Sequence, residues 1–276
     1  MGQDIIIVDK DGRGDFTYIQ DAIDSVPIDN KGVMIVVLEG TYYEKLVINK
    51  PNITLLGEPK KNVDIMFDDY KKEGFTGGAV STMATLRVVA PGFSAENLIF
   101  VNMGINEPTA EQAVCCYISA DRVQFHHCGF LGKGDSMIIA PLPLQVIDRS
   151  AEGQLAGLGR QYFRACYIEG DLSMVPGSAV AVFDYSKMQR LPRHTERGGV
   201  GGHEFGYVFR NSFFTGRIEP EILENASKVA LIECKIEGKE LTVKDAERYT
   251  LDQVFVDSSW CCVTPEYEAK MSSRAS

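Results

Sequence analysis

Four ten-residue segments of this chain share one pattern, and this repeat constrains the fold more than any other feature of the sequence. The third position is Phe or Leu, the sixth Cys or Ser, the eighth Phe or Ile, and the tenth is always Gly. The segments are Val123 to Gly132, Gln161 to Gly170, Tyr207 to Gly216 and Val229 to Gly238. Internal repeats of this size are typical of solenoids, in which each repeat packs on its neighbours.

The spacing of the terminal glycines predicts the length of one coil. Gly216 and Gly238 are 22 residues apart, and Gly170 and Gly216 are 46 apart, close to two coils. The apolar positions fit a strand, a bend and a second strand, and no single helix face would hold them. We therefore predict an all-β parallel β-helix of about ten coils, in which the tenth-position glycine occupies a corner with an unusual backbone conformation.

One domain is expected over residues 1–276, because no linker or charge block divides the chain. Residues 17–26 have a helical apolar pattern with a Thr17–Gln20 capping box, and such a helix would cover the open N-terminal end of the core. The interval from Gly132 to Gly170 is 38 residues, so about 16 residues are added to one coil. We place this inserted loop at 136–158, and we expect a mobile tail at 265–276.

Charge and cysteine content exclude several classes of partner. The net charge of −10 argues against nucleic acid and against anionic membranes, since both are polyanions. The sequence contains no run of 18 apolar residues, so no membrane span is predicted. Seven cysteines without a C-x-x-C pair, and four histidines without ligand spacing, predict no metal site, and no cofactor motif is present. Cys128, Cys166 and Cys234 share one repeat position and are expected to stack in the interior.

The cellular compartment is inferred from the same features. The first residues lack the basic and apolar regions of a signal peptide, and the odd number of cysteines favours a reducing, cytoplasmic compartment. A signal peptide upstream of this sequence would instead make the protein secreted. The sequence does not indicate an oligomeric state.

Several segments resemble the pectinesterase (pectin methylesterase) family. They are 7–57, GFSAENLIF from Gly92, QAV from Gln112, ISADR from Ile118, CGFLG from Cys128 and GRQYFRACYIEG from Gly159. The resemblance extends over about residues 5–260 and is strongest up to Gly170. It implies a right-handed parallel β-helix and removal of methyl groups from the galacturonate esters of pectin, a carbohydrate substrate.

The resemblance also implies roles for particular residues. In the family one aspartate attacks the ester carbonyl, a second gives a proton to the departing methanol, glutamines stabilise the oxyanion, and an arginine orients the nucleophile. Gln112 corresponds to the first glutamine and Asp135 to the acid/base aspartate. Gly134 stands where the second glutamine is expected, and Ser173 stands at the nucleophilic aspartate. The family's G-R-P-W motif has no counterpart, so its arginine and aromatic platform are missing.

The repeat supports a pairing of Asp135 with Ser173. Each lies three residues after its glycine, Gly132 or Gly170, which predicts neighbours on adjacent coils about 5 Å apart. Ser173 would need a base, either Asp135 or a histidine, His194 or His203, folded over the site.

Other roles for these residues stay open at this point. Asp135 could instead cap a corner of its coil, and the two histidines could simply lie at the surface. Asp171 is a possible replacement for the lost nucleophile, and the pair Asp148–Arg149 could replace the nucleophile and the arginine. We therefore place Asp135, Ser173 and Gln112 in the catalytic set. The substrate-binding set is Asp171, Gly134, Arg149, His194 and His203.

Three functions are compatible with this sequence. The first is a pectinesterase-like ester hydrolase with an altered catalytic site, acting on methyl-esterified galacturonate or a related small ester. The second is a non-catalytic relative that binds a carbohydrate or a partner in the cleft. The third is a metabolic enzyme that uses Asp135 for acid/base chemistry on a different substrate.

Overall fold

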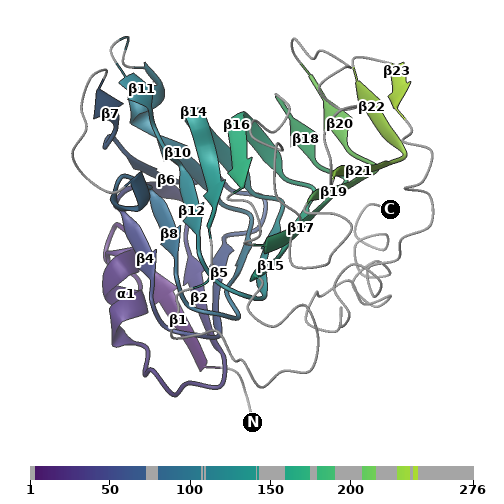
Figure 1. Cartoon of the computed structure of the whole chain (residues 1–276). Coiled ribbons are helices and arrows are strands. Elements are labelled where there is room, and N and C mark those ends of the chain that lie inside the picture. Colours follow the sequence, from purple (N-terminus) through teal and green to yellow (C-terminus); the bar gives the residue numbers. More distant parts are fainter. Residues whose placement is uncertain are drawn as a thin grey trace.

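The computed structural model describes residues 4–72, 80–106, 108, 110–140, 142, 159–174, 179–189, 207–215, 229–236 and 239–241. Two large sheets wind around a common apolar core, and successive coils stack along one axis (Figure 1). Nearly all strand pairs are parallel; the antiparallel pairs among the described residues are β7–β11 and β22–β23. The structure is therefore a parallel β-helix, as the repeat predicts.

In the described part of the chain the first sheet contains nine strands, one from each coil, in chain order. They are β1 (Asp4–Val8), β2 (Val33–Val37), β5 (Ile53–Gly57), β9 (Ser94–Glu96), β13 (Val123–His126), β15 (Gly159–Arg164), β17 (Ala179–Asp184), β19 (Tyr207–Arg210) and β21 (Val229–Ile232). Nine stacked strands agree with the expected number of about ten coils.

The second sheet has twelve strands among the described residues and covers the remaining two faces of the coils. One run is β3 (Gly40–Tyr43), β6 (Val63–Phe67), β10 (Ile99–Asn102), β14 (Gly129–Ile139), β16 (Tyr167–Met174), β18 (Lys187–Met188), β20 (Phe213–Phe214), β22 (Cys234–Ile236) and β23 (Lys239–Leu241). The other run is β4 (Leu46–Ile48), β8 (Leu86–Val88) and β12 (Cys116–Ile118), which joins the first through β14. Outside these sheets lie β7 (Lys71–Lys72), β11 (Ala110–Gln112) and two 3-10 turns, Val80–Thr82 and Met103–Asn106.

The repeat positions have distinct physical roles in the core. Third-position phenylalanines stack from coil to coil, with ring centroids 5.2 Å apart for Phe125–Phe163 and 4.4 Å for Phe163–Phe183. Phe183 belongs to a coil that is not among the four repeat segments. Its equivalent segment begins at Ala181, within the 46 residues between Gly170 and Gly216. The distance of two coil lengths between Gly170 and Gly216 had indicated this additional coil.

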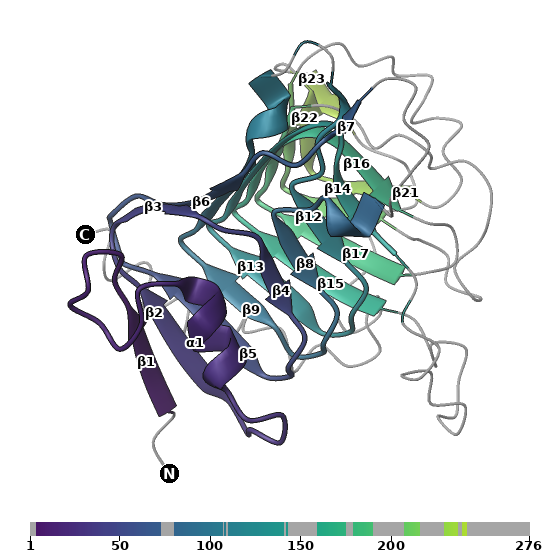
Figure 2. The ribbon, with the colours of Figure 1, turned by 90° about the vertical axis from the view of Figure 1, so that its left-hand side faces the viewer.

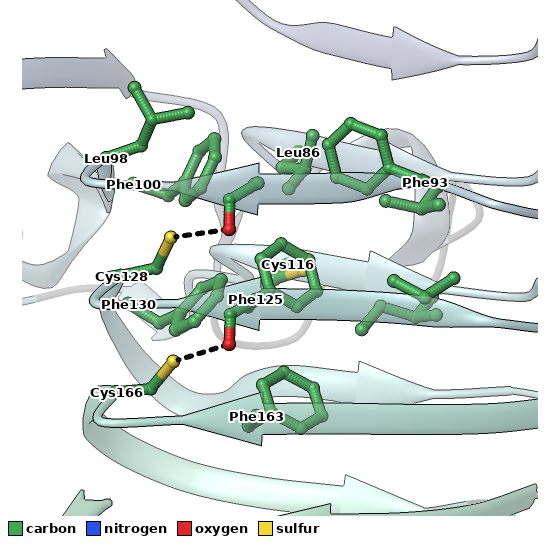
Figure 3. Packing of buried hydrophobic residues seen from close by; sticks show 14 of the residues in the cluster. Leu86, Phe93, Leu98, Phe100, Cys116, Phe125, Cys128, Phe130, Phe163 and Cys166 are labelled. Carbon is green, nitrogen blue, oxygen red and sulfur yellow. Dashed lines mark hydrogen bonds between the residues drawn. The ribbon is translucent and has the colours of Figure 1, made fainter. Parts of the chain in front are cut away.

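The sixth position links each coil to the one before it. Cys166 Sγ donates to the carbonyl oxygen of Phe125 at 3.5 Å, and Cys128 Sγ donates to that of Ala95 at 3.6 Å (Figure 3). Ser212 and Cys234 make the same contact, at 3.1 and 3.3 Å, with the third-position carbonyls of their preceding coils. Burial raises the pKa of the Cys166 thiol to about 12, which keeps it a donor. The prediction of an inward stack of small residues is confirmed.

A left-handed corner recurs at the fifth position of the repeat, which the sequence did not predict. Of the two tenth-position glycines that the structure describes, Gly170 has the expected unusual backbone, with φ at 100°, and Gly132 does not. Six successive corners have a left-handed backbone, with φ between 50° and 56°: Asn97, His127, Ala165, Tyr185, Asn211 and Glu233. The amide of His127 donates to the carbonyl of Arg164 in the next coil, at 3.0 Å, and Asn97, Ala165, Tyr185 and Asn211 make the same bond. These hydrogen bonds between neighbouring coils stabilise the left-handed backbone, so residues other than glycine are tolerated at the fifth position.

Helix α1 (Ile19–Ser25) covers the N-terminal end of the core and buries Ile19, Ala22 and Ile23 (Figure 2). The helix is confirmed, but the predicted Thr17–Gln20 capping box is wrong. Tyr18 is the N-cap residue, and its side chain makes no capping hydrogen bond. The Glu44 carboxylate instead accepts the amides of Ile19 and Gln20 at 2.9 and 3.0 Å. A carboxylate at a helix N-terminus also compensates the helix dipole.

Charged and polar side chains line the outer face of the first sheet. By strand register, Glu96, His126, Arg164, Asp184 and Arg210 lie side by side on successive coils. Asp184 is 1% exposed and accepts from Tyr162 Oη and Arg210 Nη2, both at 3.0 Å. Burial, and next the Asp184 charge, raise the pKa of Tyr162, so its hydroxyl stays a donor. This ladder of charges favours one order of coil stacking.

His126 makes the stability of this fold depend on pH. Burial, and then the nearby positive charges of His127 and Arg164, lower the pKa of His126 from 6.5 to about 4. Its neutral form stabilises the fold fully above pH 6.5, and this contribution is lost as the pH falls toward 4. From pH 7.5 to pH 5 we expect the free energy of unfolding to fall by about 2 kcal/mol from this residue.

Urea unfolding at both pH values, for the wild type and a His126→Gln variant, measures this contribution. Other groups titrate in both proteins, so the quantity of interest is the difference between their two pH dependences. Equal losses for the two proteins would contradict the assignment.

Candidate active site

β14 and β16 lie side by side, as expected, but their register pairs Asp135 with Asp171. The predicted pairing of Asp135 with Ser173 is wrong: Ser173 pairs with Ile138, three residues beyond Asp135 on β14. The cause is an irregularity in β14, which advances four residues from Leu131 to Asp135 while β16 advances two. Counting equal steps from the two glycines could not anticipate these extra residues.

The two tenth-position glycines leave room for Ser136, which follows Asp135. A Cβ atom on Gly132 would lie 2.6 Å from Ser136 Cβ, and one on Gly170 would lie 2.8 Å from the same atom. Ser136 is fully buried, and its carbonyl accepts the amide of Cys115 at 2.7 Å. Only glycine fits at Gly132 and Gly170, because the chain beside Asp135 is packed directly against them.

Part of the expected insertion is regular strand. Met137, Ile138 and Ile139 pair with β12 on one side and with β16 on the other. The prediction of a loop from residue 136 is therefore wrong for 136–139. Residues 143–158 lie outside the described part of the chain.

Gln112 lies on the coil before Asp135. Ala113 and Lys133 form an antiparallel bridge, with N–H···O distances of 2.9 Å from Ala113 and 3.1 Å from Lys133. Antiparallel order then places Gln112 beside Gly134, one residue from Asp135. The backbone thus gathers Gln112, Gly134, Asp135 and Asp171 on three consecutive coils.

Asn102 supports this arrangement and was missed by sequence reasoning. It is fully buried, and its Nδ2 donates to the carbonyls of Asp69 and Val114 at 2.7 and 2.8 Å. Its Oδ1 accepts the amide of Gly104 at 3.0 Å. A polar residue at the end of an apolar strand was the available signal, since a buried amide needs partners of this kind.

A row of outward-facing residues crosses the same coils. Register pairs Val47 with Arg87, Arg87 with Tyr117, Tyr117 with Ile138, and Ile138 with Ser173. The flanking residues of β4, β8 and β12 are buried, whereas Val47, Arg87 and Tyr117 are partly exposed. By backbone register, Ser173 is next to Ile138 at the end of this row.

Three predicted site residues, Arg149, His194 and His203, lie outside the described residues, so their roles stay predictions. Within the described part, no group of three or more His, Cys, Asp or Glu side chains is arranged to hold a metal ion. No helix in that part of the chain is both long and apolar enough to cross a membrane.

Comparison with known proteins identifies the relatives of this chain. The family model described as Pectinesterase matches residues 5–142, half of the chain. Probable pectinesterase 67 of Arabidopsis thaliana is 31% identical over 216 residues, covering 74% of this chain and 57% of the relative. Probable pectinesterase 8 of the same plant is 33% identical over 184 residues, covering 64% and 42%. The chain therefore spans about half the length of these curated relatives.

Solved structures share the fold at lower identity. A pectin methylesterase crystallised in complex with a hexasaccharide has a TM-score of 0.62 and 19% identity, covering 93% of this chain and 98% of that one. Pectin methylesterase PemA from Erwinia chrysanthemi has a TM-score of 0.60 and 17% identity over the same shares. These neighbours are right-handed parallel β-helices. The family model over half of the chain and the 31% identity to Probable pectinesterase 67 over 74% of it show that the chain belongs to the pectinesterase family.

Proposed function

We propose that this protein is a pectinesterase-type hydrolase that releases methanol from methyl-esterified galacturonate, with Asp171 in place of the missing nucleophile. The observation that carries the proposal is the register of β14 and β16, which pairs Asp135 with Asp171. Paired strands hold such residues about 5 Å apart. Two carboxyl groups at this spacing favour a state that shares one proton, so that one is ionised while the other is an acid.

The chemistry follows from this division of roles. The Asp171 carboxylate attacks the ester carbonyl, and the tetrahedral oxyanion collapses to an acyl-enzyme anhydride. Asp135 protonates the departing methoxide, which leaves as methanol. Asp135, now a base, takes a proton from water, and the hydroxide opens the anhydride. This second step restores the Asp171 carboxylate and releases the free uronate.

Gln112 is assigned to the oxyanion. Its place beside Gly134 and one residue from Asp135 supports this role, because an amide N–H there can meet charge that develops on the carbonyl oxygen. Gly134 has no side chain to supply a second donor. The proposed enzyme therefore has one glutamine donor where the family has two, and we expect slow turnover.

The second candidate is a non-catalytic carbohydrate-binding relative. Gly134 favours it, since a missing oxyanion donor typically lowers kcat by about 10²–10³-fold. The structural neighbour solved with a hexasaccharide supports a carbohydrate ligand under either reading.

Methanol release separates the two candidates. We expect the wild-type protein to release methanol from highly esterified pectin and from methylated oligogalacturonates, and Asp135→Asn to lower the rate by about 10²–10⁴-fold. A coupled alcohol-oxidase assay measures the product directly. If the wild type binds these oligosaccharides without releasing methanol, the esterase proposal is overturned and the binding function holds.

A further inference from the structure

Gln112 lies on a short two-stranded ribbon, β7 with β11, that is separate from the two large sheets (Figure 1). Lys71 pairs with Gln112, and antiparallel order places Asp69 opposite Val114, two residues from that pair on each chain. All four residues are described, and on this side the ladder between the two chains stops at the Lys71–Gln112 pair. The two chains are therefore joined at the base of the ribbon by something other than their own backbone ladder.

The side chain of Asn102 bridges the two chains at this point. Its Nδ2 donates to the carbonyl of Asp69 at 2.7 Å and to that of Val114 at 2.8 Å, so one amide group holds both chains. Its Oδ1 accepts the amide of Gly104 at 3.0 Å, which fixes the orientation of the side chain. Asn102 is fully buried, and a buried amide with its partners satisfied is held rigidly. It thereby anchors the stretch 112–115, which begins at the proposed oxyanion donor.

The same stretch also holds the backbone on both sides of Asp135. Ala113 exchanges two backbone hydrogen bonds with Lys133, at 2.9 and 3.1 Å. The amide of Cys115 donates to the carbonyl of Ser136 at 2.7 Å. Lys133 lies two residues before Asp135, and Ser136 follows it directly. A displacement of the stretch would therefore disturb the aspartate and the glutamine together.

We propose that Asn102 is a positioning residue, which sets Gln112 and Asp135 at the spacing that the reaction needs without touching the substrate. The inference rests on the proposed function, in which Gln112 meets the carbonyl oxygen of the ester and Asp135 protonates its methoxide. Both groups must reach one ester at the same time. Misplacing a catalytic group by about 1 Å can lower a rate by about 10²-fold, and with one glutamine donor the site has no second donor to compensate.

A purely structural role for Asn102 makes a different prediction: its loss would lower stability but leave the turnover of each folded molecule unchanged. Asn30 provides the matched control, at the N-terminal end and several coils before the proposed site. Its Nδ2 donates to the carbonyls of Pro27 and Pro51 at 2.9 and 2.8 Å, and its Oδ1 accepts the amide of Gly32 at 3.1 Å. Although Asn30 is partly exposed, it makes the same set of bonds as Asn102.

The first measurement compares Asn102→Asp with Asn30→Asp in methanol release from a methylated oligogalacturonate. A carboxylate has nearly the shape of the amide but cannot donate to the two carbonyls. We expect Asn102→Asp to lower kcat by about 10–10²-fold and to leave KM within about twofold of the wild type, because Asn102 does not contact the substrate. Asn30→Asp should leave both constants near the wild-type values. Asn102→Ala removes the donors without adding a buried charge, and it gives the same comparison if Asn102→Asp does not fold.

Amide hydrogen exchange, followed by NMR, tests the anchor without turnover. We expect the amides of Ala113 and Cys115 to exchange at least about tenfold faster in Asn102→Asp than in the wild type, and at the wild-type rate in Asn30→Asp. If neither amide exchanges faster in Asn102→Asp, the inference is overturned, whether or not methanol is released.

The two measurements together separate this inference from the proposed function. Faster exchange with a kcat no lower than that of Asn30→Asp would show that Asn102 is structural only, and would overturn the positioning role while the esterase stands. Faster exchange in a protein whose wild type releases no methanol would overturn the esterase proposal and the positioning role with it, leaving Asn102 as an anchor of the ribbon.

Discussion

Replacing Asp171 by Asn is expected to lower the kcat for methanol release by on the order of 10⁴-fold, while Ser173→Ala leaves it near the wild-type value. Asn has nearly the same shape as Asp but lacks the negative charge that attacks the ester. Ser173 pairs with Ile138, and it lies two residues beyond Asp171 on β16, about 7 Å along the strand. At that distance Ser173 cannot attack the ester whose methoxide Asp135 protonates.

Steady-state methanol release on a methylated oligogalacturonate gives both values, and circular dichroism of each variant checks that the β-helix is intact. The opposite pattern, with Ser173→Ala inactive and Asp171→Asn active, would show that Asp135 acts together with Ser173, as the spacing of the repeat predicts. Full activity in both variants would remove both residues from the nucleophile's role.

Asp184→Ala is expected to lower the free energy of unfolding by about 3–5 kcal/mol, the largest stability effect of any single substitution considered. The carboxylate is 1% exposed and accepts from Tyr162 and Arg210. Its removal leaves the Arg210 charge and the Tyr162 hydroxyl without their acceptor, and Tyr162 is fully buried, so water does not replace the lost acceptor there. Urea unfolding followed by intrinsic fluorescence gives the change.

Two further variants make this test specific. Glu39→Ala removes one partner of an exposed pair, Glu39–Lys61, and should change stability much less, because solvent screens that pair. Asp184→Val combined with Arg210→Met replaces both charges with apolar groups that match the neighbouring Val182 and Val208, and it should recover part of the loss. If Asp184→Ala costs no more than Glu39→Ala, the outer ladder is not a major source of stability.

The fold could be predicted because its signal is repeated. The four segments of the repeat share Phe or Leu at the third position and Cys or Ser at the sixth, so one coil that departs from the pattern does not change the predicted fold. The coil from Ala181 was overlooked for a physical reason. Its eighth position is Met188 and its tenth-position glycine is absent, yet its backbone register matches its neighbours.

The site was harder to predict because it depends on departures from the repeat. The resemblance to the family could point to Gln112 and Asp135 as candidates, and their roles stay predictions. The pairing of Asp135 with Asp171 could not be predicted, because the extra residues of β14 have no sequence signal of their own. The helix cap failed for a related reason: Glu44, which binds the helix amides, is 25 residues from Ile19 and becomes its neighbour only in the folded chain.

The buried thiols of the sixth position allow the local opening of three different coils to be measured. Cys128, Cys166 and Cys234 are free, and each belongs to a different coil. Because burial keeps these thiols protonated and covered, a thiol reagent can modify one only while its coil is open. The rate of labelling at each cysteine therefore reads the opening of a single coil, and the three rates together show whether the solenoid frays from one end or unfolds as a unit.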